Sequence, residues 1–226
     1  MNGTTSGSSL SVGRLIAVPA VFTLAVTILR LVGELQHWGA PWFNSAAGGG
    51  FAVVGISWLP IIFGPYFASK VAAAGAGPSG MGKAFGMAGL AIVVLVLGSV
   101  ILFFGFSKQM AFVVLLGGVI QLASAFVARI GWRAFGNVLL AYAFAARIPV
   151  VVVMYIAMSA KGGQGWGTHY DIAGPGFTVT SLAQKFFELS LVPQMGLWIG
   201  YTVIVGTLFG CAFLAIFGRR STAATA

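Results

Sequence analysis

Arg147 is the residue whose type and position point most directly to chemistry. It lies near the middle of an apolar stretch, residues 134–160, that is long enough to cross a bilayer. An ionised side chain at the bilayer centre costs about 2.5–3.5 kcal/mol on insertion scales, so Arg147 should face a bundle interior or a watery cavity. Two hypotheses follow. Either Arg147 binds an anion or substrate, or it caps broken backbone and extends its charge toward lipid phosphate.

Pro149 follows Arg147 by two positions and removes a backbone donor from the same predicted helix. A carbonyl about one turn earlier therefore needs a donor from elsewhere. The groups that can supply it, which also form the candidate binding set, are Arg147, Gln121, Asn137 and Tyr142.

Two predicted outer loops hold groups that can ligate a metal. His37 lies on the first loop, and His169 and Asp171 lie on the second. Imidazole and carboxylate are ordinary zinc ligands, so one metal would require these three side chains to lie within about 5 Å of one another. Hydrogen-bonded loops are the alternative interpretation. Because neither histidine lies inside a predicted span, a haem between helices is disfavoured, and we predict no cofactor.

The sequence offers few groups for catalysis. Its three acids are Glu34, Asp171 and Glu188, and it contains no nucleophile motif, phosphate-binding loop or metalloprotease helix. General acid–base chemistry would have few participants. We therefore predict that the protein is not an enzyme. A membrane enzyme built on the outer-loop His and Asp groups is kept as an alternative.

The elements that carry these residues are predicted to be transmembrane helices. Charged residues make up 7% of the chain, and the mean hydropathy is +1.01. Soluble domains carry about 25% charged residues, so most of this surface must face lipid. The net charge is +9, but the basic residues are dispersed between apolar runs, and we predict no nucleic-acid partner.

Six apolar segments have the length of a membrane helix. The predicted spans are residues 15–33, 51–69, 84–107, 110–128, 134–160 and 191–217. The predicted fold is therefore an all-α polytopic bundle, one domain over residues 1–226, with a disordered tail at 1–11.

Two local patterns modify this scheme. Pro60 and Pro65 predict a kink or break in the second span. Ser181 and Gln184 fit a helix-start capping box, which predicts a short interfacial helix before the last span.

Positive charge is distributed unevenly between the two sides of these spans. One side collects Arg14, Lys70, Lys83, Arg129, Arg133, Arg219 and Arg220, whereas the other side collects Lys108, Lys161 and Lys185. The positive-inside rule then places both termini in the cytoplasm, and we predict a multi-pass protein of a cell inner membrane.

Glycines spaced four apart predict close packing of the last span. They are Gly196 and Gly200, followed by Gly206 and Gly210. These glycines, the short loops and the lack of catalytic groups favour an accessory or organising protein. Its partners would be the lipid bilayer and other membrane protein subunits. The alternative function is a small-solute or anion transporter, with Arg147 and the kinked second span lining the path.

Residues 126–153, FVARIGWRAFGNVLLAYAFAARIPVVVV, resemble the bacterial branch of the Yip family of multi-span membrane proteins. The matching positions are Gly131, Phe135, Ala141, Tyr142, Ala143 and Pro149, and Leu197 to Gly200 of the last span are also similar. The resemblance covers about a third of the chain, and Arg147 departs from the family pattern. It implies a helical membrane protein without an established enzymatic role. Eukaryotic members contact small GTPases, a partner class that we do not carry over.

Overall fold

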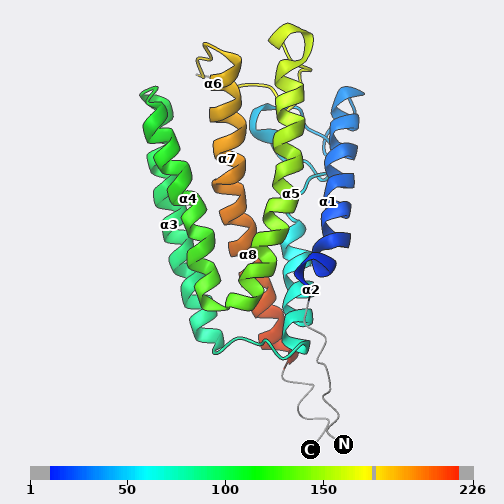
Figure 1. The fold of residues 1–226 in the computed structure, drawn as a ribbon. Coiled ribbons are helices and arrows are strands. Elements are labelled where there is room, and N and C mark those ends of the chain that lie inside the picture. Colours follow the sequence, from blue (N-terminus) through cyan, green and yellow to red (C-terminus); the bar gives the residue numbers. More distant parts are fainter. Residues whose placement is uncertain (1–10, 175–176, 219–226) are drawn as a thin grey trace, which may run out of the picture.

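The computed structural model describes residues 11–174 and 177–218, and every regular element in these ranges is helical. The long helices lie side by side in one bundle (Figure 1). Five helical stretches of the described chain are long and apolar enough to cross a membrane. They are Val12–Leu35 (α1), Met81–Ser107 (α3), Ala111–Gly131 (α4), Arg133–Gly163 (α5, Arg133–Ser159, with a final 3-10 turn) and Leu182–Phe217 (α6 to α8). The all-α prediction is confirmed for these residues.

The second predicted span differs from the structure. Its helix, α2 (Leu59–Ala73), has 15 residues, and residues 51–58 of the prediction form no helix. At 1.5 Å per residue α2 covers about 22 Å, which is short of the roughly 30 Å hydrocarbon core. Pro60 lies in its first turn, where a missing N–H is tolerated, so the chain becomes helical just before it. The six full spans stay a prediction.

The last span is longer than predicted because the capped helix runs into it. Ser181 Oγ accepts a hydrogen bond from the Gln184 N–H at 3.1 Å and starts α6 (Leu182–Phe186). A π-helical turn (Phe187–Leu191), α7 (Val192–Met195) and α8 (Leu197–Phe217) then continue the same column (Figure 1). The π turn inserts an extra residue, which changes the direction in which the following side chains point.

Close helix contacts within the chain account for the four glycines of the last span. A methyl group on Gly196 would lie 2.7 Å from the Gly118 carbonyl oxygen, and one on Gly200 would lie 2.8 Å from that of Gln121, both on α4. Gly206 packs against Leu139 of α5, and Gly210 against Phe135 of α5. These four glycines therefore allow helices of this same chain to pack closely against α8.

The first helix begins and the last helix ends at the same end of the bundle (Figure 1). Ser11 caps α1 by accepting a hydrogen bond from the Arg14 N–H at 3.5 Å. The rest of the predicted tail, residues 1–10, and the cations Arg219 and Arg220 lie outside the described residues.

Candidate functional site

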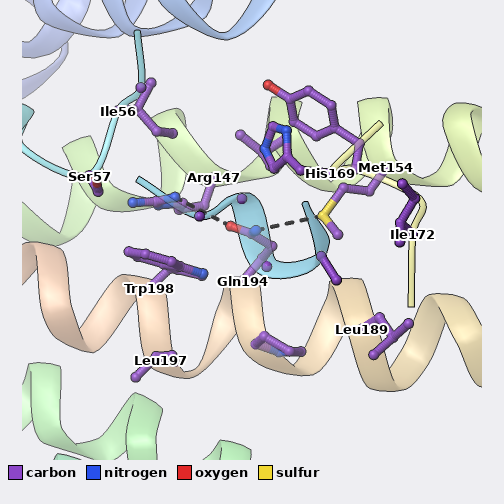
Figure 2. Close-up of a pocket in the computed structure, with 18 of the residues that line it drawn as sticks. Ile56, Ser57, Arg147, Met154, His169, Ile172, Leu189, Gln194, Leu197 and Trp198 are labelled. Atoms are coloured by element: carbon purple, nitrogen blue, oxygen red, sulfur yellow. Dashed lines mark hydrogen bonds between the residues drawn. The ribbon is translucent and has the colours of Figure 1, made fainter. Parts of the chain in front are cut away.

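A cavity of about 470 Å³ lies in the half of the bundle away from the start of α1 and the end of α8. Its walls come from α1, α5, the α6 to α8 column and the loops that follow α1 and α5 (Figure 2). Most of the walls are apolar, with Ile56, Val150 and Met154 among them. Polar groups are few and lie at defined places, as is usual for a small-molecule site.

Arg147 lies at the inner end of this cavity and is 4% exposed. Its Nη1 donates one long hydrogen bond, 3.5 Å, to Oε1 of Gln194. Its guanidinium carbon lies 4.6 Å from the ring centroid of Trp198, close enough for a cation–π interaction (Figure 2). Within the described residues, Nε has no hydrogen-bond partner. A guanidinium carries five N–H donors, so most donors of Arg147 have no protein acceptor there.

Gln194 supports Arg147 from the facing helix column and is 8% exposed. Its amide nitrogen lies 3.6 Å from the sulfur of Met154, and a thioether is a weak acceptor. The amide N–H groups of Gln194 therefore form only a weak hydrogen bond within the protein. They can donate to a ligand while the amide oxygen keeps its hydrogen bond from Arg147.

The chain segment before α2 adds positive potential at the same end of the cavity. Gly55, Ile56 and Ser57 line the cavity, and Figure 2 shows Ser57 at its Arg147 end. None of the backbone N–H groups from Gly55 to Trp58 donates a hydrogen bond to another described residue. The start of α2 carries the positive end of the helix dipole. Within a membrane protein, irregular backbone is tolerated where it is buried in protein or lines a cavity. The segment from Gly55 to Ser57 meets this condition because it lines the cavity.

No family model, curated protein or solved structure matches this chain. The resemblance to the Yip family stays a prediction, and the functional argument rests on the geometry of the cavity.

A second arginine of the cavity wall, Arg30, has a counter-ion. Its Nε donates to Oε1 of Glu34 at 2.9 Å, an ion pair between side chains four residues apart on α1. Its Nη2 donates to the carbonyl oxygens of Gly49, at 2.5 Å, and Asn44, at 3.2 Å. Arg30 thereby fixes the loop after α1 and has a counter-charge, which Arg147 lacks.

Glu34 also connects the two outer loops. Its fully buried carboxylate accepts hydrogen bonds from the backbone N–H of His169, at 2.9 Å, and from His169 Nδ1, at 2.6 Å. Burial holds the pKa of His169 below its ordinary value, although the bond to Glu34 acts in the opposite direction. His169 is therefore a neutral donor near pH 7, and it closes the wall of the cavity above Arg30.

Glu188 is the second charged group of the cavity wall without a counter-ion. It is 7% exposed and lies in the π-helical turn before α7. Its oxygens accept long hydrogen bonds, 3.4 and 3.5 Å, from the amide of Gln184. In residues 11–174 and 177–218 it forms no ion pair.

Of the predicted binding set, only Arg147 lines this cavity. Gln121 donates to Ser99 at 2.9 Å, Tyr142 shares a 2.8 Å hydrogen bond with Thr23, and Asn137 accepts from Arg129. None of the three lines the cavity. Tyr142 precedes Arg147 by five residues, which is about 140° around a helix, and Asn137 lies about 15 Å further along the axis. The acceptor Gln194 comes from a distant segment that the sequence analysis did not select.

The predicted metal set is not brought together. The described chain holds no group of three His, Cys, Asp or Glu side chains placed to ligate a metal ion. Asp171 instead accepts from the N–H groups of Gly167, at 3.0 Å, and Thr168, at 2.9 Å, and from the Thr168 hydroxyl. His169 is bonded to Glu34, so the loops satisfy these groups internally, as the alternative interpretation proposed.

Proposed function

We propose that this protein binds a small carboxylate-bearing solute in the cavity at Arg147, as the substrate site of a small-solute transporter. The observation that carries the proposal is a buried guanidinium with unused donors at the inner end of a cavity. An unpaired buried ion costs several kcal/mol, and intramembrane charges of this kind are functional-site candidates by default.

The chemistry of Arg147 suits a carboxylate. Nε is unbonded within the described residues and lies on the same planar fork as the Nη groups, so two parallel hydrogen bonds to one carboxylate are available. The Gln194 amide and the N–H group of Ser57 can add donors. A volume of about 470 Å³ lies within the usual range for small-molecule sites.

Two further features favour transport over the accessory function predicted from the sequence. The four glycines that suggested a partner protein pack within this chain. The short α2 begins after an irregular segment that lines the cavity, and non-helical backbone of this kind is found at the substrate sites of many transporters. With the termini in the cytoplasm of a cell inner membrane, as the charge distribution predicts, the cavity would face outward.

The test is equilibrium binding of 4-methylpentanoate to the purified full-length protein in nanodiscs, measured by titration calorimetry. The wild type should bind, and Arg147→Gln should lower the affinity about thirtyfold or more, because a buried charged hydrogen bond is lost. Arg129→Gln is the matched control. Arg129 lies on α4 outside the cavity and donates to Asn137 of α5 in an exposed hydrogen bond. Equal affinities of wild type and Arg147→Gln would refute the proposal. Uptake into proteoliposomes then separates transport from binding alone.

A further inference from the structure

We propose that the solute is a zwitterion with an apolar body, an amino acid in chemical class, whose carboxylate binds Arg147 and whose ammonium group binds Glu188. The inference rests on the proposed function and specifies its substrate. Its basis is the juxtaposition of two buried and unpaired charges of opposite sign on the walls of one cavity.

The other basic side chains of the wall, Arg30 and His169, already have a carboxylate partner. Arg30 is paired with Glu34, and His169 donates to the same carboxylate. This leaves Arg147 and Glu188 as the lining charges that form no ion pair within the described residues. A simple anion would satisfy Arg147 and leave Glu188 buried without a counter-charge. A zwitterion satisfies both charges and leaves the net charge of the site at zero.

Arg147 and Glu188 line the same cavity, and no ion pair joins them within the described residues. A ligand that carries one anionic and one cationic group can therefore lie between them and pair with both. An amino acid is the smallest common solute that carries these two groups.

The rest of the cavity wall is largely apolar. It includes Val150 and Met154 of α5, Leu189 and Leu197 of the α6 to α8 column, and Ile56 of the segment before α2. Methionine side chains adapt to ligands of different shape. An aliphatic side chain on the zwitterion would bury its surface here, whereas a charged one would meet no partner.

Three molecules of one shape test the proposal by calorimetry on the full chain in nanodiscs. Leucine carries both charges, 4-methylpentanoate lacks the ammonium group, and 3-methylbutylamine lacks the carboxylate. Wild-type protein should bind leucine about thirtyfold more tightly than either analogue, because each analogue leaves one buried charge unpaired. Glu188→Gln should abolish the advantage of leucine over 4-methylpentanoate. Lys185→Gln, one turn earlier in α6, is the matched control and should keep that advantage.

The outcomes separate this inference from the proposed function. If 4-methylpentanoate binds wild type as tightly as leucine, the ligand is a simple anion and the zwitterion proposal is wrong, while the carboxylate site stands. If leucine keeps its advantage in Glu188→Gln, Glu188 is not the ammonium partner and the inference also fails. If neither acid binds wild type, both proposals fail.

Discussion

The Gln194 amide oxygen is the one acceptor that the described residues offer to the Arg147 guanidinium, at 3.5 Å from Nη1. The two side chains come from α5 and α7, which pack against each other beside the cavity. A neutral amide at this distance orients the guanidinium without neutralising it. The guanidinium is therefore oriented, and most of its donors have no acceptor among the described residues.

Replacing Arg147 by Met should stabilise the ligand-free protein while abolishing binding. The substitution removes an uncompensated buried charge and keeps most of the volume, so we expect a gain of about 1–3 kcal/mol in unfolding free energy. Thermal unfolding in detergent measures it. Arg30→Met is the matched control and should destabilise, because it leaves the buried Glu34 without its cation. A lower melting temperature for Arg147→Met would show that the arginine is structural.

Trp198→Leu should weaken carboxylate binding by about three- to thirtyfold, because a cation–π contact contributes about 0.5–2 kcal/mol to holding the guanidinium. Calorimetry with 4-methylpentanoate measures the change. Trp132→Phe is the control, since the Trp132 indole donates to the Ala76 carbonyl outside the cavity. It should lower stability and leave the affinity unchanged. Unchanged affinity in Trp198→Leu would show that Trp198 does not contribute to carboxylate binding.

Glu34→Gln should cost about 3 kcal/mol of stability, because it breaks a largely buried ion pair and leaves Arg30 without a counter-charge. Denaturant or thermal unfolding of the purified protein measures the loss. Glu188→Gln should be neutral or stabilising in the same assay, because Glu188 has no ion pair within the described residues to lose. Similar losses in both variants would contradict the assigned pairing.

Stability should fall as the pH is lowered through the range below about 6.5, the ordinary pKa of histidine. The pKa of His169 is held below that value in the folded protein, mainly by burial, so the unfolded chain binds the proton first. The groups facing His169 are Arg30, Glu34 and Asp171. His169→Gln should flatten the pH profile, because the group that takes up the proton is then absent. A profile unaffected by His169→Gln would contradict the assignment.

Gly64→Ala should destabilise the bundle by about 1–3 kcal/mol, because overpacking forces helices apart. The added methyl group would lie 2.5 Å from the Gly206 carbonyl oxygen across the contact between α2 and α8. Gly86→Ala is the matched control, since no atom lies within 4 Å of its added methyl. Thermal unfolding compares the two. Equal stability would show that α2 and α8 do not pack as closely as described.

The sequence predicted the long helices well because apolar length depends on local composition alone. The bounds of α3, α4 and α5 differ from the predicted spans by a few residues. The break in the second span was anticipated from Pro60 and Pro65, but its extent was not. Whether residues 51–58 become helical depends on the packing of this segment against Arg30 and the cavity.

Arg147 is the one lining residue of the cavity that the sequence analysis selected as a candidate binding residue. The sequence showed that this arginine must avoid lipid, and the structure places it against a cavity. Its neighbour Gln194 lies 47 residues away and is aimed by a π-helical turn that no periodicity reveals. A usable signal was present, since Gln194 and Trp198 are four residues apart in the last span and must share a helix face.

The most direct test is the distance between the bound carboxylate and Arg147, measured by solid-state NMR. The sample is ¹³C-carboxyl 4-methylpentanoate on protein with ¹⁵N-labelled guanidinium groups, and Arg147→Lys identifies the signal. We predict a carbon–nitrogen distance of about 4 Å, as in a two-bond carboxylate–guanidinium pair, and its loss in the variant. A bound carboxylate with no measurable coupling to the Arg147 nitrogens would contradict the central claim.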